Sequence, residues 1–339
     1  MNKPVTDFTA KDFATDQEVR WCPGCGDYAI LKCMQRTLPE LGARPETTVF
    51  ISGIGCSSRF PYYMATYGFH TIHGRAPAVA TGVKLANPDL DVWVITGDGD
   101  GLSIGGNHLL HAIRRNVDLN ILLFNNEIYG LTKGQYSPTS RAGTRSPSTP
   151  FGSVDHPVSP CHFALGSNAR FVARTIDTAQ KHMPVVFRRA QEHRGASFVE
   201  IFQNCIVYND GVFDDFAAKQ ALAEQTLDAR HGKKLIFGKA GDKGLIFDPA
   251  SFALKVATIG ENGVTEDDIL VHDETNKQLA QMLCDLQPPD FPMVIGVLYC
   301  DPAATFNDAM HGQMAVASEK AGPPDFNTHL RQGYTWTVE

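Results

Sequence analysis

The sequence predicts an α/β protein with a mostly parallel β-sheet covered by helices on both faces. Two apolar runs, 91–96 (DVWVIT) and 120–124 (NILLF), are typical of buried strands. Between them, Leu109, Leu110 and Ile113 recur at helical spacing. Strand, helix and strand in this order form a βαβ unit, whose two strands lie parallel. We therefore expect an open sheet with ligand-binding turns at the carboxyl ends of its strands.

Composition narrows the possible classes of protein. The chain has 339 residues, is 43% hydrophobic and 20% charged, and carries a net charge of −7. These values fit one large globular domain or two ordinary ones, and the absence of a long basic run argues against nucleic acid as a partner. The sequence contains no apolar run of about 18 residues. The polar first 20 residues lack a signal-peptide core. We expect a cytoplasmic protein that does not cross a membrane.

The amino-terminal part contains two cysteine motifs. Residues 1–20 form a polar arm without periodicity, and WCPGCG follows at 21–26. Apolar residues at helical spacing predict a helix over 27–38. The buried strand 48–52 (TVFIS) ends in GIGCSSR at 53–59, where the glycines permit a close backbone approach to a ligand.

The segment HTIHGR precedes a helix of small residues predicted at 76–86. His73 and Arg75 are hydrogen-bond donors near the place where a bound phosphate would lie. Taken alone, His73 fits a structural role better than a ligand-binding one.

The central βαβ unit carries the clearest chemistry. GDGDGLSIGGNH (97–108) follows its first strand, and NNEIYGLTKGQ (125–135) follows its second. Asp98, the Asn126 amide oxygen and the Ile128 carbonyl are the hard oxygen ligands that Mg²⁺ shares with substrate phosphates. GDG followed about 27 residues later by NN is similar to the thiamine diphosphate fingerprint. The alternative is a glycine-rich αβ turn in which Asp and Asn only cap the chain.

The remaining segments are assigned from the same patterns. Residues 136–160, rich in Ser, Thr, Pro, Gly and Arg, are expected to cover the site or to contact a partner. Strands are predicted at 171–173 and 197–202, with a helix at about 178–193 between them. Beyond residue 210 we expect short strands (LIFG, GLIF, DILVHD, MVIGVLYC) and a helix at about 276–286.

Four of the eight cysteines are placed to converge. Cys22 and Cys25 flank a Pro-Gly turn, whereas Cys56 and Cys205 each follow a buried strand at the predicted ligand edge. Four thiolates fit a structural zinc ion or a [4Fe–4S] cluster, and their spacing alone does not separate the two. The adjacent thiamine chemistry favours a redox-active cluster. The other cysteines are assigned to core packing, except for the unassigned Cys161; these are Cys33, Cys284 and Cys300.

Together these motifs resemble the β subunits of 2-oxoacid:ferredoxin oxidoreductases, most closely the 2-oxoglutarate members. The matching segments are WCPGCG, GIGCSSR, HGRA, GDGDGLSIGGNH and NNEIYGLTKGQYSPTS. Cys205 matches the last cysteine ligand of the family's cluster. They cover most of the first 210 residues, while the last third fits by position and length only. The resemblance implies the thiamine diphosphate-binding fold with a C-terminal extension. It also implies an arm (1–20), a cofactor domain (21–210) and an extension packing on the core and on a partner (211–339).

The resemblance further implies a reversible reaction. A 2-oxoacid, coenzyme A and oxidised ferredoxin give an acyl-CoA, CO₂ and reduced ferredoxin; for 2-oxoglutarate the product is succinyl-CoA, and the reverse direction fixes CO₂, as in the reductive tricarboxylic acid cycle. The implied cofactors are thiamine diphosphate, Mg²⁺ and one [4Fe–4S] cluster. Their implied contacts are Ile54, Gly55, Cys56, Ser57, His73, Gly74, Gly99, Asp100, Gly130 and Leu131 for thiamine diphosphate, Asp98, Asn126 and Ile128 for Mg²⁺, and Cys22, Cys25, Cys56 and Cys205 for the cluster.

Lys133 bears on the choice of substrate. Family members acting on pyruvate often carry glycine there, whereas this chain has LTKGQ. An ammonium group at this place can pair with the distal carboxylate of 2-oxoglutarate, although a surface lysine on a mobile loop is the alternative.

The family's catalytic glutamate is expected from an α subunit, because none can be placed in this chain. We therefore expect an αβ heterodimer, paired as (αβ)₂, that is inactive without α and passes electrons to a ferredoxin. Two other hypotheses stay open within thiamine chemistry: the same reaction on pyruvate or another 2-oxoacid, and a non-redox decarboxylase with a structural zinc. A third is a non-catalytic scaffold subunit.

Overall fold

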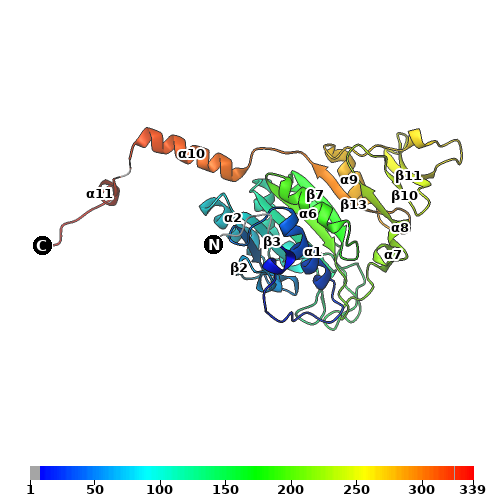
Figure 1. The fold of residues 1–339 in the computed structure, drawn as a ribbon, viewed down its shortest axis with the longest axis horizontal. Coiled ribbons are helices and arrows are strands. Elements are labelled where there is room, and N and C mark those ends of the chain that lie inside the picture. Colours follow the sequence, from blue (N-terminus) through cyan, green and yellow to red (C-terminus); the bar gives the residue numbers. More distant parts are fainter. Residues whose placement is uncertain (1–7, 324) are drawn as a thin grey trace.

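An eight-stranded sheet forms the centre of the protein. The computed structural model describes residues 8–323 and 325–339 (Figure 1). The strand order is β2-β1-β3-β4-β8-β7-β13-β9, and every neighbouring pair is parallel except β7 with β13. The strands are β1 (Thr48–Ser52), β2 (Tyr67–His70), β3 (Asp91–Gly97), β4 (Leu119–Asn125), β7 (Phe171–Ile176), β8 (Ala196–Phe202), β9 (Thr226–Ala229) and β13 (Met293–Cys300). The predicted mostly parallel sheet is confirmed.

Both faces of the sheet are buried beneath helices. On β3, Val92 and Val94 join one apolar cluster, whereas Trp93 and Ile95 join the other. This alternation follows from the two-residue period of a strand. The first cluster is covered by α2 (Ala76–Ala86), α4 (Gly106–Arg114), α5 (Pro160–Gly166) and α9 (Lys277–Asp285), and the second by α1 (Asp27–Glu40) and α6 (Met183–Glu192). Figure 1 shows α1 and α6 side by side over one face, as their mutual packing requires.

The short elements sit mainly at the edges of the sheet. They are η2 (Ala10–Phe13), η3 (Ser57–Tyr63), α3 (Asp98–Leu102), β5 (Ile128–Tyr129), β6 (Gln135–Tyr136), α7 (Asp214–Ala217), α8 (Leu222–Gln225) and η4 (Glu266–Asp268). Part of the predicted polar arm is therefore structured, and Phe13 is fully buried in the second cluster. Residues 1–7 of that arm lie outside the described residues.

Residues beyond 210 contribute to the main sheet as well as packing on it. Strands β9 and β13 complete one edge, while β10 (Ile236–Phe237), β11 (Lys243–Asp248) and β12 (Ala253–Thr258) form a separate antiparallel sheet. The chain then leaves the body through α10 (Phe306–Ala321) and α11 (Phe326–Leu330), which project as an arm in Figure 1. Segments from both sides of residue 210 therefore share the main sheet.

Two predicted elements, the strand DILVHD and the helix at about 178–193, differ from the structure. The segment DILVHD is not a strand, because the cap of η4 by Thr265 takes up its start and only Val271 forms an isolated bridge. The helix predicted from 178 begins at Met183, where Pro184 occupies a favourable first-turn position. Strands β2 and β12 were not predicted, because exposed strands lack an apolar pattern.

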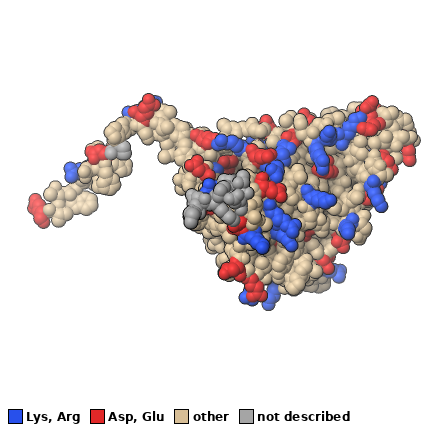
Figure 2. Space-filling view, viewed as in Figure 1, with Lys and Arg blue, Asp and Glu red and all other residues tan. Residues whose placement is uncertain are grey.

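Two properties of the described surface bear on the membrane and nucleic-acid expectations. No described helix is long and apolar enough to cross a membrane. On the face drawn in Figure 2, basic and acidic side chains are interspersed over the body instead of forming one basic stripe. Such a mixed surface does not have the electrostatic footprint of a nucleic-acid-binding face.

The central strand should dominate stability. Replacing the fully buried Ile121 of β4 with alanine leaves a cavity between sheet and helices, so we expect a loss of about 2–5 kcal/mol in the free energy of unfolding. The matched change at the exposed Val256 of β12 should stay within about 0.5 kcal/mol. Urea unfolding followed by circular dichroism measures both, and equal losses would contradict this account of the core.

Candidate functional site

The predicted cofactor residues meet in one pocket at the carboxyl edge of the sheet. The turns after β1, β3 and β4 converge there because these strands are parallel neighbours. The pocket is lined by Ile54, Gly55, Cys56, Ser57, His73, Gly97, Asp98, Gly99, Asp100, Phe124, Asn126, Ile128, Tyr129, Gly130, Leu131 and Thr132. Of the residues assigned to thiamine diphosphate, Gly74 alone does not line it. Gly74 lies behind the wall, where its N–H donates to Asp100 Oδ1 at 2.8 Å.

Asp100 ties three turns of the pocket together. Its Oδ1 also accepts from the N–H of Ile54 at 3.1 Å, and its Oδ2 accepts from Thr96 Oγ1 at 2.7 Å. The carboxylate leaves no space beside Gly53, where a Cβ would lie 2.0 Å from Asp100 Oδ2. Asp100 is thus a buried support for the pocket wall, a more specific role than the general lining role predicted for it.

Asp98 is held by two hydroxyl groups from the predicted cover. Ser137 Oγ and Thr139 Oγ1 each donate to Asp98 Oδ2 at 2.6 Å. Burial raises the pKa of Asp98 to about 6, and these hydrogen bonds partly oppose that effect. A buried carboxylate with a raised pKa is stabilised by a cation. The start of the 136–160 segment therefore supports the candidate magnesium site, a role the sequence did not reveal in detail.

Asn126 and Ile128 complete the oxygen donors expected for Mg²⁺. Asn126 Nδ2 donates to Gln203 Oε1 at 2.8 Å, and Asn126 Oδ1 accepts from the N–H of Ile128 at 3.2 Å. Together with Asp98, they provide a carboxylate, an amide oxygen and a backbone carbonyl on one pocket wall. This donor set fits the coordination chemistry of Mg²⁺.

The glycines of the central turn are required by close contacts. A Cβ on Gly99 would lie 2.2 Å from the ring of Tyr129, whose hydroxyl donates to the Gly99 carbonyl at 3.0 Å. At Gly74, φ is +67° and a Cβ would lie 2.4 Å from Gly105. These glycines therefore let neighbouring segments of the pocket wall pack directly against one another.

The four selected cysteines line a second cavity, of about 260 Å³, beside this pocket. Gly130 lies between the two, where a Cβ would be 3.5 Å from both Cys56 Sγ and Cys205 Sγ. No cysteine of the chain is in a disulfide. Among the described residues, no three His, Cys, Asp or Glu side chains gather closely enough for a single metal ion. The thiols thus surround a space instead of meeting at a point.

Electrostatics at this cavity disfavour negative charge on the thiols. Burial, together with the negative charges of Asp27, Cys205 and Cys22, raises the pKa of Cys56 to about 12. Burial is also the main cause that raises the pKa of Cys25. Coordination to a metal would offset this effect, because metal ligation deprotonates a thiol.

His73 and Lys133 are at the rim. His73 is exposed, and its Nδ1 lies 3.8 Å from Asp100 Oδ1. Lys133 is exposed in the Gly130–Gly134 turn, lines the cysteine cavity and has a φ of 76°. This backbone conformation suits glycine and is unfavourable for lysine.

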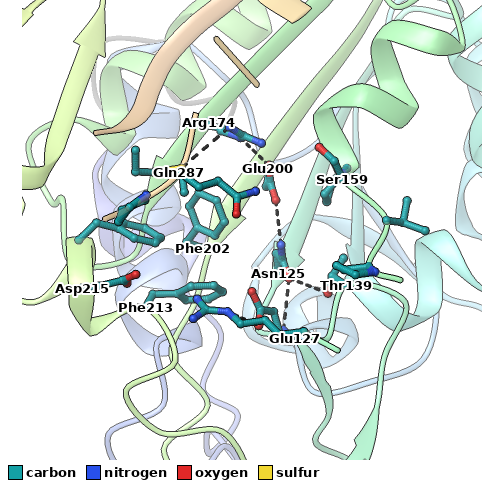
Figure 3. A pocket seen from close by; sticks show the side chains of 17 residues that line it. Asn125, Glu127, Thr139, Ser159, Arg174, Glu200, Phe202, Phe213, Asp215 and Gln287 are labelled. Atoms are coloured by element: carbon teal, nitrogen blue, oxygen red, sulfur yellow. Dashed lines mark hydrogen bonds and ion pairs between the residues drawn. The ribbon is translucent and has the colours of Figure 1, made fainter. Parts of the chain in front are cut away.

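A hydrogen-bonded network behind the site was not predicted. Figure 3 shows Arg174 paired with Glu200, which in turn accepts from Asn125. Arg174 Nε lies 2.8 Å from Glu200 Oε2, and Asn125 Oδ1 accepts from Thr139 Oγ1 at 3.0 Å. These residues line a cavity of about 240 Å³. A charged residue inside each of two apolar strands, FVARTI and SFVEIF, was the available signal.

Comparisons with known proteins agree with the geometry. Residues 53–201 match the family model of the thiamine pyrophosphate enzyme C-terminal TPP binding domain. The 2-oxoglutarate oxidoreductase subunit KorB of Mycobacterium tuberculosis is 50% identical over 343 residues, covering 99% of this chain and 91% of the relative. The 2-oxoacid:ferredoxin oxidoreductase 1 subunit beta of Aeropyrum pernix is 47% identical over 190 residues, covering 56% of this chain and 60% of the relative.

A solved structure is similar across the whole chain. It is a 2-oxoglutarate:ferredoxin oxidoreductase from Magnetococcus marinus with 2-oxoglutarate, coenzyme A and succinyl-CoA bound. The match has a TM-score of 0.75 and 33% sequence identity, and it covers 97% of each chain.

The contact between Gly53 and Asp100 can be tested by two glycine substitutions. Gly53→Ala places a methyl group against the Asp100 carboxylate, so we expect a loss of about 1–3 kcal/mol in unfolding free energy. Gly82 of α2 has no atom within 4 Å of the corresponding Cβ position, and Gly82→Ala should be neutral or stabilising. Thermal or urea unfolding compares them, and a neutral Gly53→Ala would show that the turn does not depend on this contact.

Proposed function

The chain belongs to the family of 2-oxoacid:ferredoxin oxidoreductase β subunits, and we propose that it works with an α subunit on 2-oxoglutarate. In this reaction 2-oxoglutarate, coenzyme A and two oxidised ferredoxins give succinyl-CoA, CO₂ and two reduced ferredoxins, and the reverse direction fixes CO₂. The observation that carries the proposal is the pairing of two sites. The oxygen-lined pocket and the four-cysteine cavity meet at Gly130.

The oxygen-lined pocket fits thiamine diphosphate and Mg²⁺. Asp98, Asn126 and the Ile128 carbonyl would hold the metal ion, and the backbone of the glycine-rich turns would hold the diphosphate. When bound, thiamine diphosphate supplies the nucleophilic carbon and the electron sink that decarboxylation of a 2-oxoacid requires. Ser137 and Thr139 fix the Asp98 carboxylate, so that it is preorganised for the metal.

The four-cysteine cavity supports an iron–sulfur cluster better than zinc. A structural zinc ion needs its thiolates at about 2.3 Å around one point. Within 8–323 and 325–339, however, the acidic, histidine and thiol side chains form no such single-ion group, and the cysteines border a cavity of about 260 Å³. Cys22, Cys25, Cys56 and Cys205 would hold a [4Fe–4S] cluster, which transfers electrons one at a time.

The conformation of Lys133 supports a role in binding substrate. A lysine at φ 76° costs roughly 1–2 kcal/mol relative to glycine, so this position holds a lysine despite local strain. Lys133 lines the cysteine cavity together with Leu131, which also lines the oxygen-lined pocket, and this nearness supports a contact with substrate. We propose that this group pairs with the distal carboxylate of 2-oxoglutarate.

The thiamine site is incomplete without a partner. No glutamate lines the pocket among the residues that the structure describes, which supports a catalytic glutamate supplied by the α subunit. The edge strand β2 presents Tyr67 and Phe69 to solvent, exposed by 64% and 48%, and Ile72, just beyond the strand and next to the pocket residue His73, is 65% exposed. An exposed apolar edge of this kind marks an interface. We propose that the α subunit covers it within an (αβ)₂ assembly that reduces ferredoxin.

Substrate choice is tested with the co-purified αβ complex and a panel of 2-oxoacids, using a one-electron dye as acceptor. Lys133→Ala removes a charge-assisted contact worth about 1.5–3 kcal/mol. We therefore expect the KM for 2-oxoglutarate to rise about 10–100-fold, with little change for pyruvate. Lys133→Gly is the matched control for backbone strain and should behave like Lys133→Ala. Equal losses on both substrates would remove Lys133 from substrate recognition.

The cluster is tested by colour and metal content. Anaerobically purified complex should be brown, and its visible absorbance should fall when dithionite is added. Cys25→Ser should abolish this absorbance, whereas Cys33→Ser should keep it, because Cys33 is buried in α1 beside Thr37. A colourless wild-type protein with stoichiometric zinc would refute the redox function. In that case, release of thiamine diphosphate on denaturation would indicate a thiamine enzyme, and its absence would indicate a scaffold subunit.

A further inference from the structure

Gln203 is a buried glutamine that contacts a candidate ligand of each proposed cofactor. It follows β8, and only 1% of its surface is exposed. Its Oε1 accepts from Asn126 Nδ2 at 2.8 Å, while its Nε2 lies 3.2 Å from Cys25 Sγ and 2.6 Å from the Asn204 carbonyl. Asn126 belongs to the oxygen-lined pocket and Cys25 to the cysteine cavity. One amide group therefore joins the two sites.

The orientation of this amide is determined by its neighbours. An amide NH₂ has two donor hydrogens, and the Cys25 sulfur and the Asn204 carbonyl use both. A flipped amide would place its oxygen against the Asn204 carbonyl and its nitrogen against Asn126 Nδ2. Both contacts would then join like groups, so only the observed orientation satisfies this buried side chain.

The orientation of Gln203 in turn fixes that of Asn126. Because Gln203 Oε1 can only accept, the NH₂ group of Asn126 must face it. The Asn126 oxygen therefore remains on the side of Ile128, whose N–H donates to it at 3.2 Å. An inverted Asn126 would offer Mg²⁺ an NH₂ group, which is not a ligand. Gln203 thus selects the atom that Asn126 presents to the metal.

The same amide acts on the thiol side. Hydrogen bonds to ligand sulfurs stabilise the reduced, more negative state of an iron–sulfur cluster and raise its reduction potential. Backbone contacts hold Gln203 in place, since its N–H donates to the Asn125 carbonyl at 2.9 Å and the neighbouring Asn204 carbonyl accepts from Gly26 N–H at 3.2 Å. The donor therefore has little freedom to leave Cys25.

We infer that Gln203 is a positioning residue shared by both cofactors: it orients Asn126 toward Mg²⁺ and tunes the cluster through Cys25. This inference rests on the proposed function. It extends that function because it identifies one side chain that contacts both the oxygen-lined pocket, where decarboxylation is proposed, and the cysteine cavity, where electrons are proposed to be accepted.

The test uses two variants of the αβ complex that separate the two roles. Gln203→Met removes the acceptor and both donors. Gln203→Glu keeps an acceptor for Asn126 but, at alkaline pH where the carboxyl is ionised, has no proton to donate to Cys25. Two quantities are measured: the midpoint potential of the cluster, by dye-mediated titration, and the Mg²⁺ concentration at which metal-stripped complex retains thiamine diphosphate.

We expect a lower midpoint potential in both variants. The Mg²⁺ requirement should rise about 10–100-fold in Gln203→Met and stay close to that of the wild type in Gln203→Glu. Gln35→Met is the control, because Gln35 donates to the Tyr63 carbonyl, lines neither cavity and should change neither quantity.

Unchanged potentials, or equal changes in Mg²⁺ requirement in both variants, would overturn the inference. If Gln203→Met does not fold, Gln203→Glu decides alone, since an unchanged potential there refutes the role at Cys25. A wild-type complex without a redox-active cluster would instead refute the proposed function. In that case the Mg²⁺ measurement would still report on the contact between Gln203 and Asn126.

Discussion

The parallel alignment of β1, β3, β4 and β8 is the constraint on which the rest of the structure depends. Parallel neighbours end at one edge, so the turns that follow them meet even though their residues lie far apart in the sequence. The glycine-rich turns, the paired asparagines and the segments of Cys56 and Cys205 leave from that edge, where the Cys22–Cys25 turn joins them. Burial of both sheet faces fixes which side chains point into the core, and thus leaves only the turns free to carry chemistry.

At this edge, buried polar side chains hold the segments of the two cavities in position. Asp98 is gripped by hydroxyls from the covering segment, Asp100 ties three turns together, and Gln203 spans the two cavities. Each of these side chains is buried, and each is held in place by hydrogen bonds to other segments of the chain. A site built in this way loses little freedom when it takes up a charged cofactor, because the donors and acceptors are already in place.

The sequence predicted the elements whose patterns are strong. β1 and α2 lie where predicted, and the oxygen and thiol donors meet as their strand positions implied. The supporting residues were not predictable, because nothing local marks Ser137, Thr139 or Gln203 as neighbours of Asp98 or Cys25. Their roles depend on contacts between segments far apart in sequence. Similarly, β9 could not be assigned to the main sheet, since its pairing with β13 joins residues more than sixty positions apart.

The buried pair Arg174–Glu200 has a consequence for how this family can diverge. The two residues are direct partners in the register of β7 and β8, and both are almost completely buried. Loss of either residue leaves the opposite charge buried without a partner, which lowers the free energy of unfolding by about 3–5 kcal/mol. Joint replacement of both by apolar side chains is tolerated far better. Substitutions at these two positions should therefore be inherited together. The pair also penalises any slip of β7 along β8, and so preserves the alignment of the sheet edge through evolutionary drift elsewhere.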